Sequence, residues 1–209
     1  MTHPPQGLIE DAATLGVTLT ATDAARLMRL LEELQRWNRT YNLTAIRDPE
    51  KMLTHHLLDS LSVQADLHGT TVADVGTGAG FPGLPLAVVN PDRRFTLIDA
   101  SGKKVRFVEH AARELGLTNV NAIHGRVEEL DVTEPFDTVV ARAFAALPEF
   151  VREVANLCGP DTRVLAMKGK LPRAEIDALP PGWRHDHTRE LVVPGLDEAR
   201  CVVILRRSG

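Results

Sequence analysis

Cysteine is scarce in this chain of 209 residues, with Cys158 and Cys201 as its only two. They lie too far apart for a C-x-x-C pair, which argues against a disulfide scaffold or a zinc site and fits a reducing compartment. No apolar run approaches the roughly 20 residues of a membrane span. The N-terminus also lacks the charged-then-apolar pattern of a signal peptide. We therefore expect a cytoplasmic protein with no bound metal and no membrane contact.

Positive charge is not in excess either. The chain carries 24 Lys and Arg against 28 Asp and Glu, for a formal net charge of −4. This balance weighs against a general nucleic-acid binder, which is usually basic, although local basic patches can still attract phosphates. The hydrophobic fraction of 44% and the charged fraction of 25% are those of an ordinary globular protein.

The first part of the chain has helical patterns. A short amphipathic helix is expected around Leu8–Leu15. Thr20-x-x-Asp23 has the spacing of a capping box, and the apolar positions behind it predict a helix that ends near Asn38. Asp48-Pro49 marks a further helix start. We expect residues 1–68 to form a helical extension packed on the remainder.

From Thr71 onward, strand-like and helix-like segments alternate. Strands are expected at 71–75, 94–99, 119–124, 136–141 and 162–167, and helices at 83–90, 103–115, 147–158 and 171–178. Such alternation implies a mostly parallel sheet with helices on both faces. Trp183–Val193 and Arg200–Arg207 have no helix between them, so they should form an antiparallel hairpin. The expected fold is α/β, with residues 69–209 as one structural unit.

A glycine-rich turn follows the first expected strand. Residues 74–83 are Asp-Val-Gly-Thr-Gly-Ala-Gly-Phe-Pro-Gly. Glycine permits positive φ angles and lets a ligand lie against bare main chain. The start of the following helix presents unpaired N–H groups at the same place. An ordinary βα turn is the alternative interpretation, but four glycines behind an acidic residue favour a cofactor cradle.

The residues around this turn distinguish between two cofactors. Asp99 ends the second strand 21 positions after Gly78, the spacing at which a carboxylate meets the two ribose hydroxyls of an adenosine. A nicotinamide dinucleotide would require a third glycine where Phe81 stands, and Asp74 would lie near its anionic pyrophosphate. S-adenosylmethionine instead carries a sulfonium and an ammonium, which tolerate a nearby carboxylate. The pattern favours S-adenosylmethionine.

The motif at residues 74–85 resembles that of class I methyltransferases, and in particular the bacterial 16S ribosomal RNA guanine-N7 methyltransferase family, also called glucose-inhibited division protein B. Further matches to this family follow in order over about residues 30–170: Trp37-Asn38, Tyr41-Asn42-Leu43-Thr44, His56-x-x-Asp59-Ser60, Asp99-Ala100-x-x-Lys103-Lys104, Gly125-Arg126-Val127-Glu128, Ala141-Arg142-Ala143 and Met167-Lys168-Gly169. The resemblance implies a Rossmann-like fold and methyl transfer from S-adenosylmethionine to N7 of a guanosine in 16S rRNA.

The same resemblance implies a set of cofactor-binding residues: Gly76, Gly78, Phe81, Asp99, Val127, Glu128 and Arg142. Gly76 and Phe81 would line the methionine and adenosine part of the pocket, and Asp99 would bind the ribose hydroxyls. Val127 and Glu128 would flank the adenine, while Arg142 would close the site beside the acceptor. For Glu128 and Arg142, a surface ion pair is the alternative interpretation.

No general base is expected among these residues, because guanine N7 already exposes a lone pair and positioning can supply much of the acceleration. Exocyclic-amine methyltransferases have an Asn/Asp-Pro-Pro-aromatic run after the fourth strand, where this chain has 142–145, Arg-Ala-Phe-Ala. Carbon-5 methylation needs a thiol nucleophile. We expect Cys158 in a helix and Cys201 in the last strand, with neither thiol facing a pocket.

The expected partner is 16S rRNA, within the small ribosomal subunit or an assembly intermediate, bound by a monomer. Basic residues that could contact phosphates, or simply be solvated, are Arg36, Arg39, Arg47, Lys51, Lys103, Lys104, Arg106, Lys168, Lys170 and Arg173. Trp37, Tyr41 or Phe144 could stack on a flipped base, although helical register favours Trp37 as a core residue. The alternatives are a small-molecule methyltransferase, an NAD-dependent oxidoreductase, and a non-catalytic ribosome-assembly factor.

Overall fold

A seven-stranded sheet forms the centre of the molecule in the computed structural model, which describes residues 5–144 and 146–208. Its strands are β1 (Thr71–Val75), β2 (Arg94–Asp99), β3 (Val120–His124), β4 (Phe136–Arg142), β5 (Cys158–Lys168), β6 (Trp183–Leu191) and β7 (Arg200–Arg207). Their order across the sheet is β3-β2-β1-β4-β5-β7-β6. Strands β1 to β5 are parallel, whereas β7 pairs antiparallel with both β5 and β6. The predicted α/β fold with a C-terminal hairpin is confirmed.

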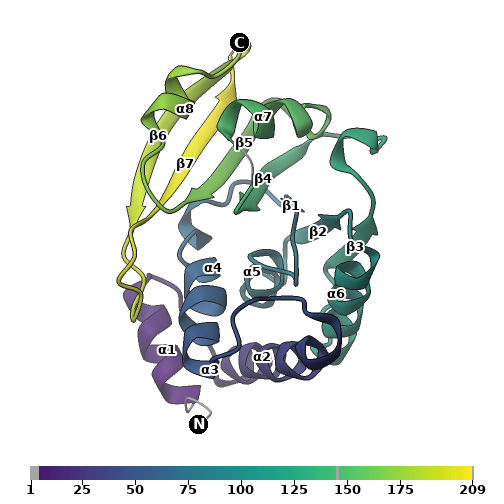
Figure 1. The fold of residues 1–209 in the computed structure, drawn as a ribbon, viewed down its shortest axis with the longest axis vertical. Helices are drawn as coiled ribbons and strands as arrows, with labels where there is room; N and C mark the ends of the chain where they lie inside the picture. Colours follow the sequence, from purple (N-terminus) through teal and green to yellow (C-terminus); the bar gives the residue numbers. More distant parts are fainter. Residues whose placement is uncertain (1–4, 145, 209) are drawn as a thin grey trace.

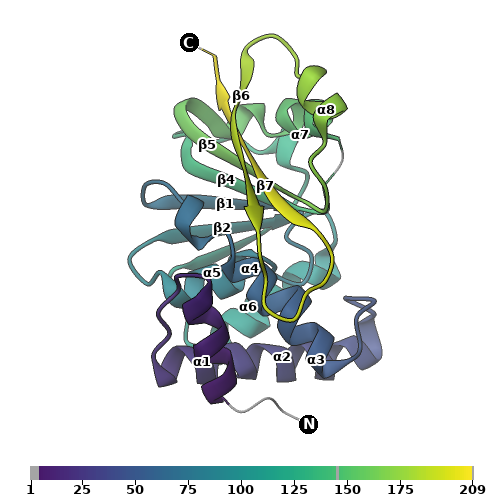
Figure 2. The ribbon, with the colours of Figure 1, turned by 90° about the vertical axis from the view of Figure 1, so that its left-hand side faces the viewer.

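Helices cover both faces of this sheet (Figure 1, Figure 2). The helical elements are α1 (Pro5–Thr14), α2 (Ala21–Tyr41), α3 (Pro49–Met52), a π-helical segment (Leu53–Leu58), α4 (Asp59–Leu61), α5 (Gly83–Val89), α6 (Gly102–Glu114), α7 (Leu147–Glu153) and α8 (Arg173–Asp177), with short 3₁₀ turns at Gln64–Asp66, Val127–Glu129 and Ala155–Leu157. Figure 2 shows α1 to α6 below the sheet and α7 and α8 above it. No helix in these ranges is long and apolar enough to cross a bilayer.

Alternate residues of the strands enter two separate cores, as the two-residue period of a strand requires. Val72 and Leu97 pack toward the N-terminal helices, whereas Ala73 and Ile98 pack toward α7. The first of these cores also contains buried leucines from α1 and α2, such as Leu8. The N-terminal helices therefore share one core with the sheet rather than forming a core of their own.

The predicted helix starts are present in the structure. Thr20 and Asp23 form a capping box in which the Asp23 N–H donates to Thr20 Oγ1 over 3.1 Å, and the Thr20 N–H donates to Asp23 Oδ2 over 3.0 Å. Asp48 caps α3 by accepting from the Glu50 N–H over 2.9 Å. Helix α2 continues to Tyr41, beyond the predicted end near Asn38, and stops where Asn42 takes a left-handed φ of 48°.

One expected helix is wrong at its C-terminal end. Helix α7 stops at Glu153, and Cys158 begins β5 instead of ending a helix. Thr162 explains the early strand, because its Oγ1 donates to the Phe136 carbonyl over 2.6 Å and accepts from the Gly159 N–H over 2.8 Å. The bond to Phe136 joins β5 to the start of β4 beside a register shift, and the bond from Gly159 lies within β5. The Cys158 thiol is partly buried, and its burial raises its pKa to about 12.

Candidate active site

The glycine turn lies at the carboxyl end of β1, between β1 and α5. Gly76, Gly78 and Gly80 all have positive φ angles, between 62° and 87°. A Cβ at Gly80 would lie 2.3 Å from Leu84 Cδ1, so that glycine is required by packing inside the turn. A Cβ at Gly78 would meet no atom closer than the Gly76 carbonyl at 4.0 Å, which leaves bare main chain facing open space. The turn therefore has the shape of a cradle for a ligand.

Asp74 organises this turn from inside. Its side chain is fully buried, and its Oδ2 accepts from Thr77 Oγ1 over 2.6 Å and from the Gly83 N–H over 2.7 Å. Its other oxygen, Oδ1, is buried without a hydrogen-bond partner among the described residues. Burial raises the pKa of Asp74 to about 6, against the opposing effect of those hydrogen bonds.

Asp99 ends β2 beside the cradle, as its spacing from Gly78 predicts. Its Oδ2 accepts from the Gly78 N–H over 2.8 Å, and its Oδ1 accepts from the Ser101 N–H over 2.8 Å. Lys104 Nζ lies 3.7 Å from Oδ2. A carboxylate has about four lone-pair sites, so Asp99 retains capacity for a pair of hydroxyl donors. It can hold the turn and a ribose at the same time.

Val127 and Glu128 follow β3, whose end is paired with the end of β2 through His124 and Asp99. Val127 is buried in a 3₁₀ turn, whereas Glu128 is exposed and lies 3.6 Å from Arg126 Nη1. Glu128 thus makes the surface ion pair that the alternative interpretation expected. Both residues still lie at the carboxyl side of the sheet, two strands away from the glycine turn.

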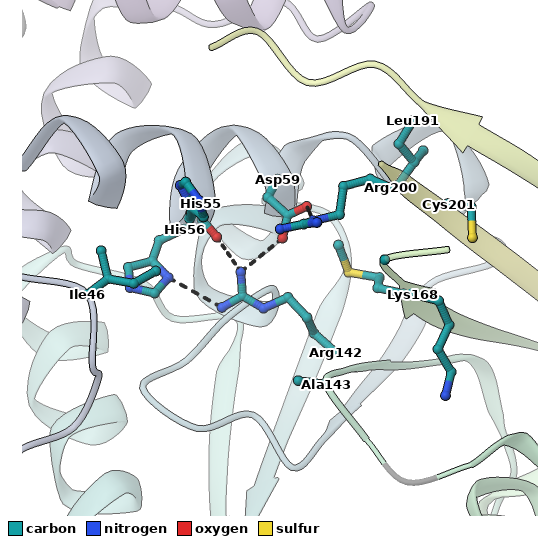
Figure 3. A pocket seen from close by; sticks show the side chains of 12 residues that line it. Ile46, His55, His56, Asp59, Arg142, Ala143, Lys168, Leu191, Arg200 and Cys201 are labelled. Carbon is teal, nitrogen blue, oxygen red and sulfur yellow. Dashed lines mark hydrogen bonds and ion pairs between the residues drawn. The ribbon is translucent and has the colours of Figure 1, made fainter. Parts of the chain in front are cut away.

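Arg142, the last residue of β4, is held by the N-terminal helical region rather than by solvent (Figure 3). Its Nη1 donates to the His55 carbonyl and to Asp59 Oδ2, the latter over 3.1 Å. Its Nη2 lies 3.4 Å from His56 Nδ1, and its Cζ lies 5.7 Å from the centroid of the Phe81 ring. Arg142 therefore joins the glycine turn to the helical region. The expected alternative, an ion pair, is present, but its side chain is only 21% exposed.

The π-helical segment explains how a main-chain carbonyl is available to Arg142. The Asp59 N–H donates to the carbonyls of Thr54 and His56 and passes over that of His55, its partner in an ordinary α-helix. The His55 carbonyl accepts from Arg142 instead. Local widening of the helix therefore creates an acceptor directed at the end of β4.

His56 is buried at the centre of this group. Its ring stacks on Phe81 with centroids 4.7 Å apart, and its Nε2 lies 3.2 Å from Thr44 Oγ1. Burial, together with the charges of Arg142 and His55, lowers the pKa of His56 to about 3. The imidazole is neutral near pH 7. Nδ1 then accepts from Arg142 while the Nε2–H donates to Thr44.

A cavity of about 320 Å³ opens beside Arg142, between the π-helical segment and the ends of β4, β5 and β7. Its charged lining consists of Asp59, Arg142, Lys168 and Arg200. Its apolar lining includes Ile46, Met167 and Leu191. Figure 3 shows Asp59 between the guanidinium groups of Arg142 and Arg200. The cavity combines apolar walls with cationic groups, and Arg142 connects it to the glycine turn.

The role of the helical region was missed by sequence reasoning. His56 and Asp59 were noted as part of a motif but were given no function, and Arg200 was assigned only to a strand. The signal available for His56 and Asp59 was their spacing, because residues three positions apart on a helix share a face. Neither His55 nor His56 belongs to a metal cluster, since the described residues contain no group of three or more His, Cys, Asp or Glu that could hold an ion.

Residues 23–203 match the family described as rRNA small subunit methyltransferase G, GidB. The chain belongs to this family. Its relatives include the ribosomal RNA small subunit methyltransferase G of Cronobacter sakazakii, which is 45% identical over 96% of both chains. The protein of the same name from Pseudomonas paraeruginosa is 44% identical over 99% of this chain and 97% of its own. The resemblance noted in the motifs is confirmed over nearly the whole length.

Solved structures support the same fold at lower identity. A SAM-dependent methyltransferase from Aquifex aeolicus has a TM-score of 0.58 at 20% identity, covering 79% of this chain and 97% of that one. TrmN from Thermus thermophilus has a TM-score of 0.57 at 24% identity, covering 75% of this chain and 53% of that one. The fold is therefore that of class I methyltransferases. The oxidoreductase alternative is not favoured.

Proposed function

We propose that this protein transfers a methyl group from S-adenosylmethionine to N7 of a guanosine in 16S rRNA. The observation that carries the proposal is the placement of Arg142, which lies over the Phe81 ring of the glycine turn on one side and lines a cationic cavity on the other. Family membership supplies the reaction class, methylation of small-subunit rRNA. When bound, the cofactor supplies an electrophilic methyl group on a sulfonium.

In this proposal the glycine turn and Asp99 hold the cofactor. Gly78 would offer bare main chain. Gly76, whose Cβ position lies 3.3 Å from the Phe144 ring, would line the pocket together with Phe81, and Asp99 would accept from the ribose hydroxyls. Val127 and Glu128 would flank the adenine, and for this Glu128 would exchange its surface ion pair with Arg126 for a contact with the base. The N7 lone pair needs no proton removed, so the chain's task is to orient the two reactants and exclude water.

Arg142 would close the cofactor site next to the acceptor. Its contacts with the His55 carbonyl, His56 and Asp59 fix the guanidinium in one position, which limits the entropy lost when substrate binds. The neutral His56 beneath it provides an acceptor without adding a like charge. A small-molecule methyltransferase would be better served by an apolar, enclosed cavity, and three cations on this cavity favour RNA.

The RNA would reach the site over exposed cations at the carboxyl side of the sheet. Arg39 and Arg47 are exposed near the end of α2, and Lys103 Nζ donates to the Tyr41 carbonyl over 2.9 Å, which joins the start of α6 to that end. Such groups contact phosphates without reading sequence. We further propose that the target lies in the small subunit or an assembly intermediate, and that the protein acts as a cytoplasmic monomer. We also propose that residues 1–68 are a helical extension of the methyltransferase unit at 69–209.

Transfer of tritium from labelled S-adenosylmethionine to small ribosomal subunits tests this function. The subunits should come from cells that lack the gene, so that the target is unmethylated. We expect label in 16S rRNA, released as 7-methylguanine on depurination. Binding of S-adenosylhomocysteine and of RNA without any transfer would instead support a non-catalytic assembly factor. Binding of NADH without S-adenosylhomocysteine would contradict the cofactor assignment.

A further inference from the structure

Asp59 lies in the cavity wall, and one of its two carboxylate oxygens has no hydrogen-bond partner among the described residues. Its side chain is only 4% exposed, and its Oδ2 accepts from Arg142 Nη1. Its Oδ1 is buried without a hydrogen-bond partner among the described residues, and Arg200 Nε lies 3.4 Å away. One buried carboxylate therefore stands between two arginines, one from β4 and one from β7.

We propose that this cavity receives the target nucleotide and that Asp59 is a positioning residue which holds Arg142 and Arg200 side by side for it. The inference rests on the proposed function. Neither arginine is buried completely, with exposed side-chain fractions of 21% and 23%. Each can therefore contact Asp59 on one side and present the remaining guanidinium donors to a ligand on the other.

The chemistry of the cavity fits a nucleotide. Met167 and Leu191 provide apolar surface for the faces of a base. Two guanidinium groups held by one carboxylate leave an uncompensated positive charge, which suits a phosphate or the O6 acceptor of guanine. The volume of about 320 Å³ lies at the lower end of ligand pockets and suits a single nucleotide rather than a longer segment. Arg142 connects this cavity to the glycine turn, so that the base and the cofactor would be neighbours.

Asp59→Asn tests the positioning role, because the amide keeps the size of the side chain and removes the charge that holds both arginines. We expect kcat/KM for methylation of small subunits to fall about 10–100-fold, the size of coupling within one shared network. Asp66→Asn is the matched control. Asp66 is equally buried in the helical extension and pairs with Arg189, away from the cavity. It should lose stability with kcat/KM within about twofold of the wild type.

A double-mutant cycle separates positioning from a general loss of stability. If Asp59 acts through Arg200, the effects of Asp59→Asn and Arg200→Ala on kcat/KM will be less than additive, and Arg200→Lys will restore part of the activity. Arg200→Ala should raise KM for the subunit and leave S-adenosylhomocysteine affinity unchanged. Additive effects, or full activity of Asp59→Asn beside an active wild type, would overturn this inference alone. An inactive wild type would overturn the proposed function, and the inference with it.

Discussion

The imidazole of His56 lies almost flat on the phenyl ring of Phe81, with ring planes 18° apart. The two residues come from different parts of the fold, one from the helical region and the other from the glycine turn. Their contact, together with the bonds from Arg142 to Asp59 and the His55 carbonyl, makes the N-terminal region a wall of the candidate active site.

The pH dependence of stability should depend on His56. Its pKa is about 3 in the folded protein and near 6.5 in the unfolded chain. Between these two values, His56 is protonated in the unfolded chain and neutral in the folded protein, so a fall in pH favours unfolding. This contribution to stability is complete above pH 6.5 and is lost as the pH falls, by at most about 1.4 kcal/mol per pH unit. Urea unfolding of the wild type and of His56→Gln at pH 7 and pH 5.5 measures it. The difference in unfolding free energy between the wild type and His56→Gln should be smaller at pH 5.5 than at pH 7. An equal difference at both pH values would contradict the lowered pKa of His56.

Two glycines in the same turn should respond differently to alanine. At Gly78 the new Cβ has open space, so the main cost is the left-handed backbone, about 1–2 kcal/mol. At Gly80 the new Cβ lies 2.3 Å from Leu84 Cδ1, which adds an overpacking cost of about 1–3 kcal/mol. Chemical denaturation should therefore rank Gly80→Ala as the less stable variant. Calorimetry should show that Gly78→Ala binds S-adenosylhomocysteine more weakly, and equal affinity would place the cofactor elsewhere.

Asp99→Ala should weaken S-adenosylhomocysteine binding by about 1–3 kcal/mol, because the ribose hydroxyls lose a charged acceptor. Part of that loss reflects the turn itself, since Asp99 also holds the Gly78 N–H. Asp99→Asn serves as the comparison, because its amide oxygen can still accept from the main chain. Isothermal titration calorimetry of both variants provides the measurement. Wild-type affinity in Asp99→Ala would exclude its ribose role.

Arg142→Ala should reduce methyl transfer more than it reduces RNA binding. In the proposed site the guanidinium is one cation among many that contact RNA, but it also connects the cofactor turn with the cavity. Filter binding and single-turnover transfer on the same subunits measure the two effects. Arg184→Ala is a suitable control, because Arg184 is exposed on β6 and pairs with Asp186. A parallel loss of binding and transfer in Arg142→Ala would assign it to RNA binding alone.

The parts of the fold that depend on short-range sequence patterns were predictable from the sequence. The capping box at Thr20 and Asp23, the strand alternation after Thr71 and the antiparallel hairpin all follow from short-range patterns, and all are present. The end of α7 was not predictable in this way. It depends on the hydrogen bond from Thr162 to the Phe136 carbonyl, two residues that lie 26 positions apart.

The candidate site was predictable only in part, for the same reason. Gly78 and Asp99 are brought together by a strand–turn–helix unit whose spacing is visible in the sequence. Asp74, an acid in the same motif, holds the turn through two hydrogen bonds because it is buried, and burial is a tertiary property. The pairing of Asp59 with Arg142 spans 83 positions and depends on a π-helical segment that has no reliable sequence signal.

The central claim is tested most directly by mapping methylated nucleotides in 16S rRNA from cells with and without this gene. Mass spectrometry of nuclease digests locates each methyl group and its position on the base. The proposed function predicts one 7-methylguanosine in 16S rRNA that disappears with the gene and returns with the wild-type copy but not with Arg142→Ala. An unchanged set of rRNA methylations in the deleted strain would contradict it.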